Sequence, residues 1–178
     1  MAYFINLLTF SRIFLGVIIF ALLTRPEGYF PALILFFIAG ASDYFDGYLA
    51  RKYNLESTLG AVIDPIADKI LITFTVIALS VDLGSSYVAF LGSIMLAREY
   101  WVSALRDFNA REGNINATQV TLLAKIKTAV QLGTFCLYLL GLYLNNALIV
   151  FVANFFLFTA LIITLQTGLS YTISTFKK

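Results

Sequence analysis

The 178-residue sequence contains no histidine. This absence excludes a histidine general base, phosphohistidine chemistry and most zinc sites, so a catalytic base must be Asp, Glu, Lys or Tyr. The single cysteine, Cys136, lies in an apolar stretch and can form neither a disulfide within the chain nor a thiolate cluster for a metal. Charge is also sparse, at 12% of residues with a net charge of +2 and no basic run, so we expect no nucleic-acid partner.

Apolar residues are abundant instead. They make up 60% of the chain, and the mean hydropathy is +0.88. A soluble domain would carry about a quarter charged residues. The composition therefore predicts an all-α polytopic membrane protein in contact with membrane lipids, with residues 1–178 forming one integral-membrane domain.

Six stretches are long enough to span a bilayer, which takes about 20 mostly apolar residues. Proline, glycine or asparagine marks three of the connections between them, at Pro26, Gly84 and Asn145. A signal peptide is the alternative for the first stretch, but Arg12 lies inside it rather than before it, which favours a retained helix. The six predicted transmembrane helices cover residues 5–23, 29–51, 60–81, 87–105, 125–144 and 147–169.

The positive charges are distributed unequally between the two sides of this predicted topology. Six spans place both termini on one side, and Arg25 is the one Lys or Arg residue assigned to the other side. The remaining eleven of the twelve basic residues lie toward the side of the termini. The positive-inside rule identifies that side as cytoplasmic.

Four of the ten acidic residues lie within a short segment, as Asp43, Asp46, Asp64 and Asp68. Spacings of three and four place each pair on one face of a helix, so two facing helices would gather all four carboxylates. A divalent metal relieves the resulting repulsion, and carboxylate oxygens suit Mg²⁺ or Mn²⁺. We therefore expect these aspartates to bind two such ions. The alternative is that they only mark the polar ends of two membrane helices.

An ion pathway is a different interpretation of the same acids, because intramembrane carboxylates often mark one. Transporter sites lie near the middle of the bilayer. The aspartates lie instead near span ends, beside Arg51 and Lys52. This position favours an interfacial enzyme over a divalent-cation transporter or a non-catalytic scaffold.

The full pattern resembles the signature of the CDP-alcohol phosphatidyltransferases, and no position departs from it. It reads Asp43-x2-Asp46-Gly47-x2-Ala50-Arg51-x8-Gly60-x3-Asp64-x3-Asp68. The resemblance implies the six-helix CDP-alcohol phosphotransferase fold and a single catalytic domain. It also implies a metal-dependent transferase that uses CDP-diacylglycerol, and a homodimer in the bacterial cytoplasmic membrane whose active site faces the cytoplasm.

The resemblance also assigns residue roles. Asp43, Asp46 and Asp64 match metal ligands, and Asp68 matches a metal ligand that is also the catalytic base. The first helix carries an N-x2-T-x2-R element placed near the nucleotide, although Ile5 stands where some members have proline; helix capping is the alternative for its asparagine and threonine. The CDP group would be lined by Asn6, Thr9, Gly47, Ala50, Arg51 and Gly60, with Arg12 completing the element.

Two later stretches resemble the phosphatidylglycerophosphate synthases within that family. They are Arg98-Glu99-x3-Ser103-x-Leu105-Arg106 and Lys125-x-Lys127-Thr128. The resemblance implies glycerol 3-phosphate as the acceptor, its phosphate bound by Arg98, Arg106, Lys125 and Lys127, with Glu99 paired to one of these cations. Two alternatives stay open: another acceptor, such as an inositol phosphate or phosphatidylglycerol, and cations that serve only as anchors at the membrane interface.

Overall fold

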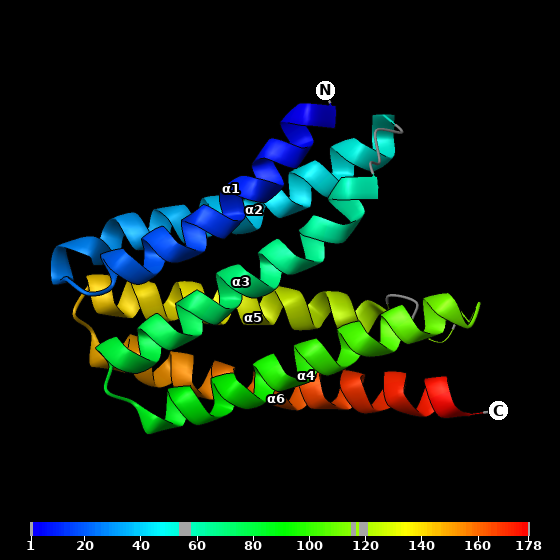
Figure 1. The fold of residues 1–178 in the computed structure, drawn as a ribbon. Coiled ribbons are helices and arrows are strands. Elements are labelled where there is room, and N and C mark those ends of the chain that lie inside the picture. The colour runs from blue at the N-terminus through cyan, green and yellow to red at the C-terminus, as the bar shows by residue number, and fades with distance from the viewer. Residues whose placement is uncertain (1, 54–57, 115–116, 118–120, 178) are drawn as a thin grey trace.

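Figure 1 shows the fold in a computed structural model, which describes residues 2–53, 58–114, 117 and 121–177. The side chains of residues 2–8, 43–53, 58–59 and 61–62 are outside this description. The described chain forms six α-helices and one short 3₁₀ helix, which confirms the predicted all-α class. Their bounds are α1 Ala2–Leu22, η1 Pro26–Gly28, α2 Tyr29–Tyr53, α3 Thr58–Asp82, α4 Ser86–Arg111, α5 Leu122–Tyr143 and α6 Ala147–Phe176.

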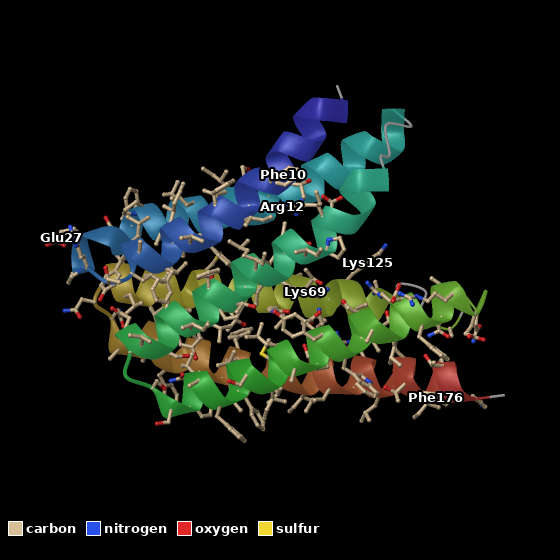
Figure 2. The ribbon with its side chains drawn as sticks, viewed as in Figure 1. Phe10, Arg12, Glu27, Lys69, Lys125 and Phe176 are labelled. Atoms are coloured by element: carbon tan, nitrogen blue, oxygen red, sulfur yellow. The ribbon has the colours of Figure 1, made fainter. Side chains whose placement is uncertain are left out.

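The helices form one elongated bundle with both chain ends at the same end of it (Figure 1). Helix α3 packs against α1 and α4, and α2 packs against α1 and α5. Helix α6 completes the bundle by packing against α4 and α5. Glu27, in the connection between α1 and α2, marks the opposite end (Figure 2).

The outer faces of the bundle are apolar. Helices α4, α5 and α6 are each long and apolar enough to cross a membrane, and shorter apolar helical segments cover Thr9–Leu22 and Pro26–Ser42. Large apolar side chains such as Phe14, Phe37 and Phe90 are exposed on these faces. Such faces suit contact with lipid tails, as expected for an integral membrane protein.

The hydrophobic core takes buried side chains from all six α-helices. Phe36 of α2 meets Phe135 of α5 edge to face, with ring centroids 6.0 Å apart at 83°. Ile19, Leu79 and Leu157 are also fully buried in this cluster. Lipid tails are as apolar as these side chains, so close packing rather than the hydrophobic effect holds the helices together.

The predicted short connections are confirmed. Asn145 adopts a positive φ of 47°, and the side chain of Asn146 accepts hydrogen bonds from the first turn of α6. Gly28 allows η1 to close tightly on α1, because a Cβ there would lie 1.9 Å from the carbonyl oxygen of Leu22. Pro65 lies within α3, well after its first residue.

Two helices extend well beyond their predicted last residues. Helix α4 continues to Arg111 rather than to residue 105, and α6 continues to Phe176 rather than to residue 169. Hydropathy marks where the apolar span ends, whereas backbone hydrogen bonds continue a helix into the interface. Polar contacts hold the added turns: Arg111 pairs with Asp107 at 2.8 Å, and Asn109 donates to Thr175 at 2.8 Å.

Helices α1 and α3 approach each other closely at Gly16. A Cβ on Gly16 would lie 3.2 Å from the backbone Cα of Leu71. Gly16 is four residues after Arg12, and Leu71 is three residues after Asp68. The close backbone approach therefore lies one turn away from the polar residues of the site.

Candidate active site

Arg12 connects α1 to α3 by binding two of the four motif aspartates, Asp64 and Asp68. Its Nη1 donates to Oδ1 of Asp68 at 2.5 Å, and its Nη2 donates to Oδ1 of Asp64 at 3.3 Å. The Arg12 side chain has no exposed surface. A buried guanidinium is costly unless it is paired, and these two carboxylates supply the pairing.

Thr9 strengthens the same contact from one turn earlier on α1. Its hydroxyl donates to Oδ1 of Asp64 at 2.5 Å and accepts a longer bond, 3.4 Å, from Nη2 of Arg12. The i, i+3 spacing places Thr9 and Arg12 on one helix face. Two residues of the predicted first-helix element, Thr9 and Arg12, therefore face Asp64 and Asp68. The sequence indicated that Arg12 lies near the nucleotide, but not that it bonds Asp64 and Asp68.

Asp64 and Asp68 remain accessible although Arg12 is buried. Their side chains are 42% and 44% exposed, respectively. The arginine therefore holds one oxygen of each carboxylate from inside the bundle, and the groups stay open to the outside. Gly60, in the first turn of α3, is buried.

The other half of the predicted motif lies on α2. The backbone places Asp43, Asp46, Gly47, Ala50 and Arg51 in the last three turns of this helix. Their side chains, and that of Asn6 in the first turns of α1, lie outside the described residues. The roles predicted for these residues stay predictions.

A second polar cluster joins α4 to α5 at Glu99. Its Oε1 accepts from Nζ of Lys127 at 2.5 Å and from Nη1 of Arg98 at 3.2 Å. All three side chains are mostly buried. The expectation that Glu99 pairs with one predicted acceptor cation is confirmed, and the structure adds that it pairs with two.

Helix α6 makes further contacts with Arg98, and the sequence did not predict them. Nη2 of Arg98 donates to Oγ1 of Thr167 at 2.6 Å. The neighbouring Gly168 makes room for the arginine, because a Cβ there would lie 2.9 Å from Nε of Arg98. The available signal was the recurrence of Thr164, Thr167 and Tyr171 on one face of an otherwise apolar helix.

The remaining two predicted acceptor cations are exposed. The guanidinium of Arg106 lies 5.8 Å from the ring centroid of Tyr171, a distance that suits a cation–π contact. Lys125 lies two residues before Lys127, and residues at that spacing do not face each other on a helix. Lys125 therefore projects from a different side of α5 than Lys127.

The two clusters, a buried cation joined to two aspartates and two cations around one glutamate, suit a membrane enzyme that handles anionic substrates. The model of the CDP-alcohol phosphatidyltransferase family matches residues 3–166, so the chain belongs to that family. Curated relatives include the CDP-diacylglycerol--glycerol-3-phosphate 3-phosphatidyltransferases of Shigella flexneri serotype 5b (strain 8401) and Escherichia coli (strain K12). Each is 32% identical over 142 residues, which cover 80% of this chain and 76% of the relative.

Members of this family use divalent metals. Asp64 and Asp68 fit such a role, because they are accessible and offer carboxylate oxygens alone, the donor type preferred by hard divalent cations. Among the described side chains no group of three or more candidate ligands assembles. Two of the four predicted ligands, Asp43 and Asp46, lie outside that set.

Proposed function

We propose that the protein transfers a phosphatidyl group from CDP-diacylglycerol to sn-glycerol 3-phosphate, giving phosphatidylglycerophosphate and CMP. The observation that carries the proposal is the cluster formed by Arg98, Glu99 and Lys127, which holds two mostly buried cations where α5 meets α4, the helix that packs against the aspartate helix α3. A phosphorylated acceptor needs such cations, whereas a neutral alcohol does not. The names of the curated relatives support the same acceptor.

In this proposal two Mg²⁺ or Mn²⁺ ions are held by Asp43, Asp46, Asp64 and Asp68. Such ions supply neutralisation of pyrophosphate charge and stabilisation of the attacking and leaving oxygens. The CDP group is lined by Asn6, Thr9, Gly47, Ala50, Arg51 and Gly60. Arg12 orients the carboxylates of Asp64 and Asp68 from within the bundle.

The chemical step follows from these assignments. Asp68 accepts the proton of an acceptor hydroxyl, whose oxygen bonds to the lipid-side phosphorus. The bond from that phosphorus to the oxygen of CMP breaks, and CMP leaves. Arg98, Arg106, Lys125 and Lys127 bind the acceptor's own phosphate and so hold its hydroxyl near Asp68.

The distribution of basic residues supports a site that faces the cytoplasm, where CDP-linked substrates and glycerol phosphates occur. Figure 2 places Arg12, Lys69 and Lys125 away from Glu27, which lies with Arg25 in the connection at the opposite end. We further propose that the enzyme acts as a homodimer in a bacterial cytoplasmic membrane.

The test is CMP release by the purified protein in detergent with CDP-diacylglycerol and a panel of acceptors. We expect turnover with glycerol 3-phosphate and none with serine. Turnover only with an inositol phosphate or phosphatidylglycerol would overturn the acceptor assignment while keeping the transferase chemistry. The family assignment itself disfavours the divalent-cation transporter that the acid cluster also suggested.

A further inference from the structure

Lys69 follows Asp68 directly on α3 but faces a different part of the bundle. Successive residues on an α-helix are rotated by about 100°. Asp68 faces Arg12 on α1. Lys69 shares a face of α3 with Val76, seven residues later, and the side chain of Val76 packs against Gly92 of α4. Helix α4 runs back along α3, so Glu99, seven residues after Gly92, lies on the side of Lys69 and is among its electrostatic neighbours. Lys69 therefore lies between the aspartates and the cation cluster, and Figure 2 labels it on α3.

The ammonium group of Lys69 lacks the kind of side-chain partners that Arg98 and Lys127 have among the described residues. Arg98 and Lys127 both donate to Glu99, and Arg98 also donates to Thr167. Lys69 is half-buried, yet its Nζ makes no hydrogen bond or ion pair with the described side chains. A half-buried cation is stabilised when an anionic ligand binds beside it.

Among the described side chains, positive charge exceeds negative charge around this position. Arg98 and Lys127 both pair with Glu99, and Lys69 and the nearby Arg106 add two more cations. The other nearby carboxylate, Asp68, already pairs with Arg12. The surplus positive charge suits a dianionic phosphomonoester better than a phosphodiester or a neutral alcohol.

We propose that Lys69 binds the phosphate of the acceptor and determines specificity for a phosphorylated acceptor. The inference rests on the proposed function and adds a cation on α3 to those on α4 and α5. Because Lys69 and Asp68 are adjacent on one rigid helix, the phosphate and the reacting hydroxyl are positioned from the same element. This arrangement selects acceptors by the distance between their phosphate and hydroxyl groups.

The experiment compares Lys69→Met and Lys69→Arg with the wild type in steady-state CMP release. Lys69→Met should raise the apparent KM for glycerol 3-phosphate by about 10- to 100-fold, the effect of one lost charge-assisted bond. The apparent KM for CDP-diacylglycerol should change by less than about threefold, a small free-energy difference. Lys69→Arg, which keeps the charge, should recover most of the affinity.

A matched control is Arg111→Gln, which removes a basic residue of α4 that is 77% exposed and pairs only with Asp107 among described residues. It should leave both KM values unchanged. Methyl phosphate supplies a second readout, because it is a dianionic phosphomonoester with no hydroxyl to react. It should inhibit competitively against glycerol 3-phosphate, with a Ki raised in Lys69→Met by the same factor as the KM.

Three outcomes would overturn the inference. An unchanged acceptor KM in Lys69→Met would make Lys69 only an interface anchor, and an equal rise in both KM values would assign it to the donor. A wild type that works only with a neutral acceptor would overturn the inference and the proposed function together. If the wild type instead prefers an inositol phosphate, the proposed function fails, and a raised KM for that acceptor in Lys69→Met still supports the inference.

Discussion

Arg12 and Asp68 lie 56 positions apart in the sequence, and Nη1 of the arginine donates to Oδ1 of the aspartate at 2.5 Å. The same guanidinium reaches Asp64 through Nη2. One buried side chain of the first helix therefore fixes two carboxylates of the third.

The first prediction concerns Arg12 itself. A lysine cannot reproduce two divergent bonds from one planar group, so Arg12→Lys should lose activity by at least about tenfold, and Arg12→Ala by more. CMP release measures the loss, and thermal unfolding in detergent separates it from misfolding. Phe14→Ala, which removes an exposed aromatic from the same helix, is the control and should retain activity. Near-wild-type turnover in Arg12→Ala would show that the aspartates need no partner on α1.

Removal of divalent metal should abolish activity. The reason is the predicted set of four aspartates, two of which the structure shows to be accessible. Activity should disappear with EDTA and return when Mg²⁺ or Mn²⁺ is added in excess. A protein that keeps full activity after exhaustive chelation contradicts the two-ion proposal.

Asp68→Asn tests the proposed base. The substitution keeps the shape of the side chain but removes its charge and its capacity to accept a proton. Turnover should fall by about 10²-fold or more, while binding of CDP-diacylglycerol is partly retained. Turnover within a few-fold of wild type would assign the proton to another group.

Glu99→Ala tests the link between α4 and α5. The change leaves Arg98 and Lys127 without their shared carboxylate, and loss of one partner of a buried ion pair costs about 3 kcal/mol. The melting temperature should fall in detergent, with a rise in the KM for glycerol 3-phosphate. Glu112→Ala removes an exposed acid at the end of the same helix and should alter neither quantity.

Variants of the cations proposed to bind the acceptor should differ in their kinetic effects from a variant of Arg51, which is proposed to bind the CDP group. Alanine at Arg98, Arg106 or Lys125 should raise the apparent KM for glycerol 3-phosphate by about 10- to 100-fold and change that for CDP-diacylglycerol far less. Arg51→Ala should show the opposite pattern. If the three alanine variants leave the acceptor KM unchanged, these cations serve only as interface anchors.

The sequence predicted the number and order of the helices well, because each apolar span is a local property of about 20 residues. It underestimated α4 and α6, because their last turns are held by contacts such as Asn109 to Thr175 that hydropathy does not detect. The aspartate motif was recognised because its residues and spacing resemble the family signature. The partners of its aspartates Asp64 and Asp68 were not recognisable from the sequence, because the bonds from Arg12 and Thr9 depend on how α1 packs against α3.

The acceptor region shows the same limit. The basic residues were predicted by resemblance, and the pairing of Glu99 was predicted from its charge. The contribution of Thr167 and Gly168 depends on which face of α6 meets Arg98. The place of Lys69 likewise depends on the packing of α3 against α4, which no local pattern encodes.

The contact at Gly16 makes the polar site sensitive to changes at a position that meets no substrate. A methyl group there would press on the backbone of Leu71 at 3.2 Å, and a larger side chain would force α1 and α3 apart. Arg12 lies one turn along α1, so the separation would be transmitted to its bonds with Asp64 and Asp68. A random-mutagenesis screen for inactive enzyme should therefore recover substitutions at this glycine, which is buried between two helices and carries no reactive group.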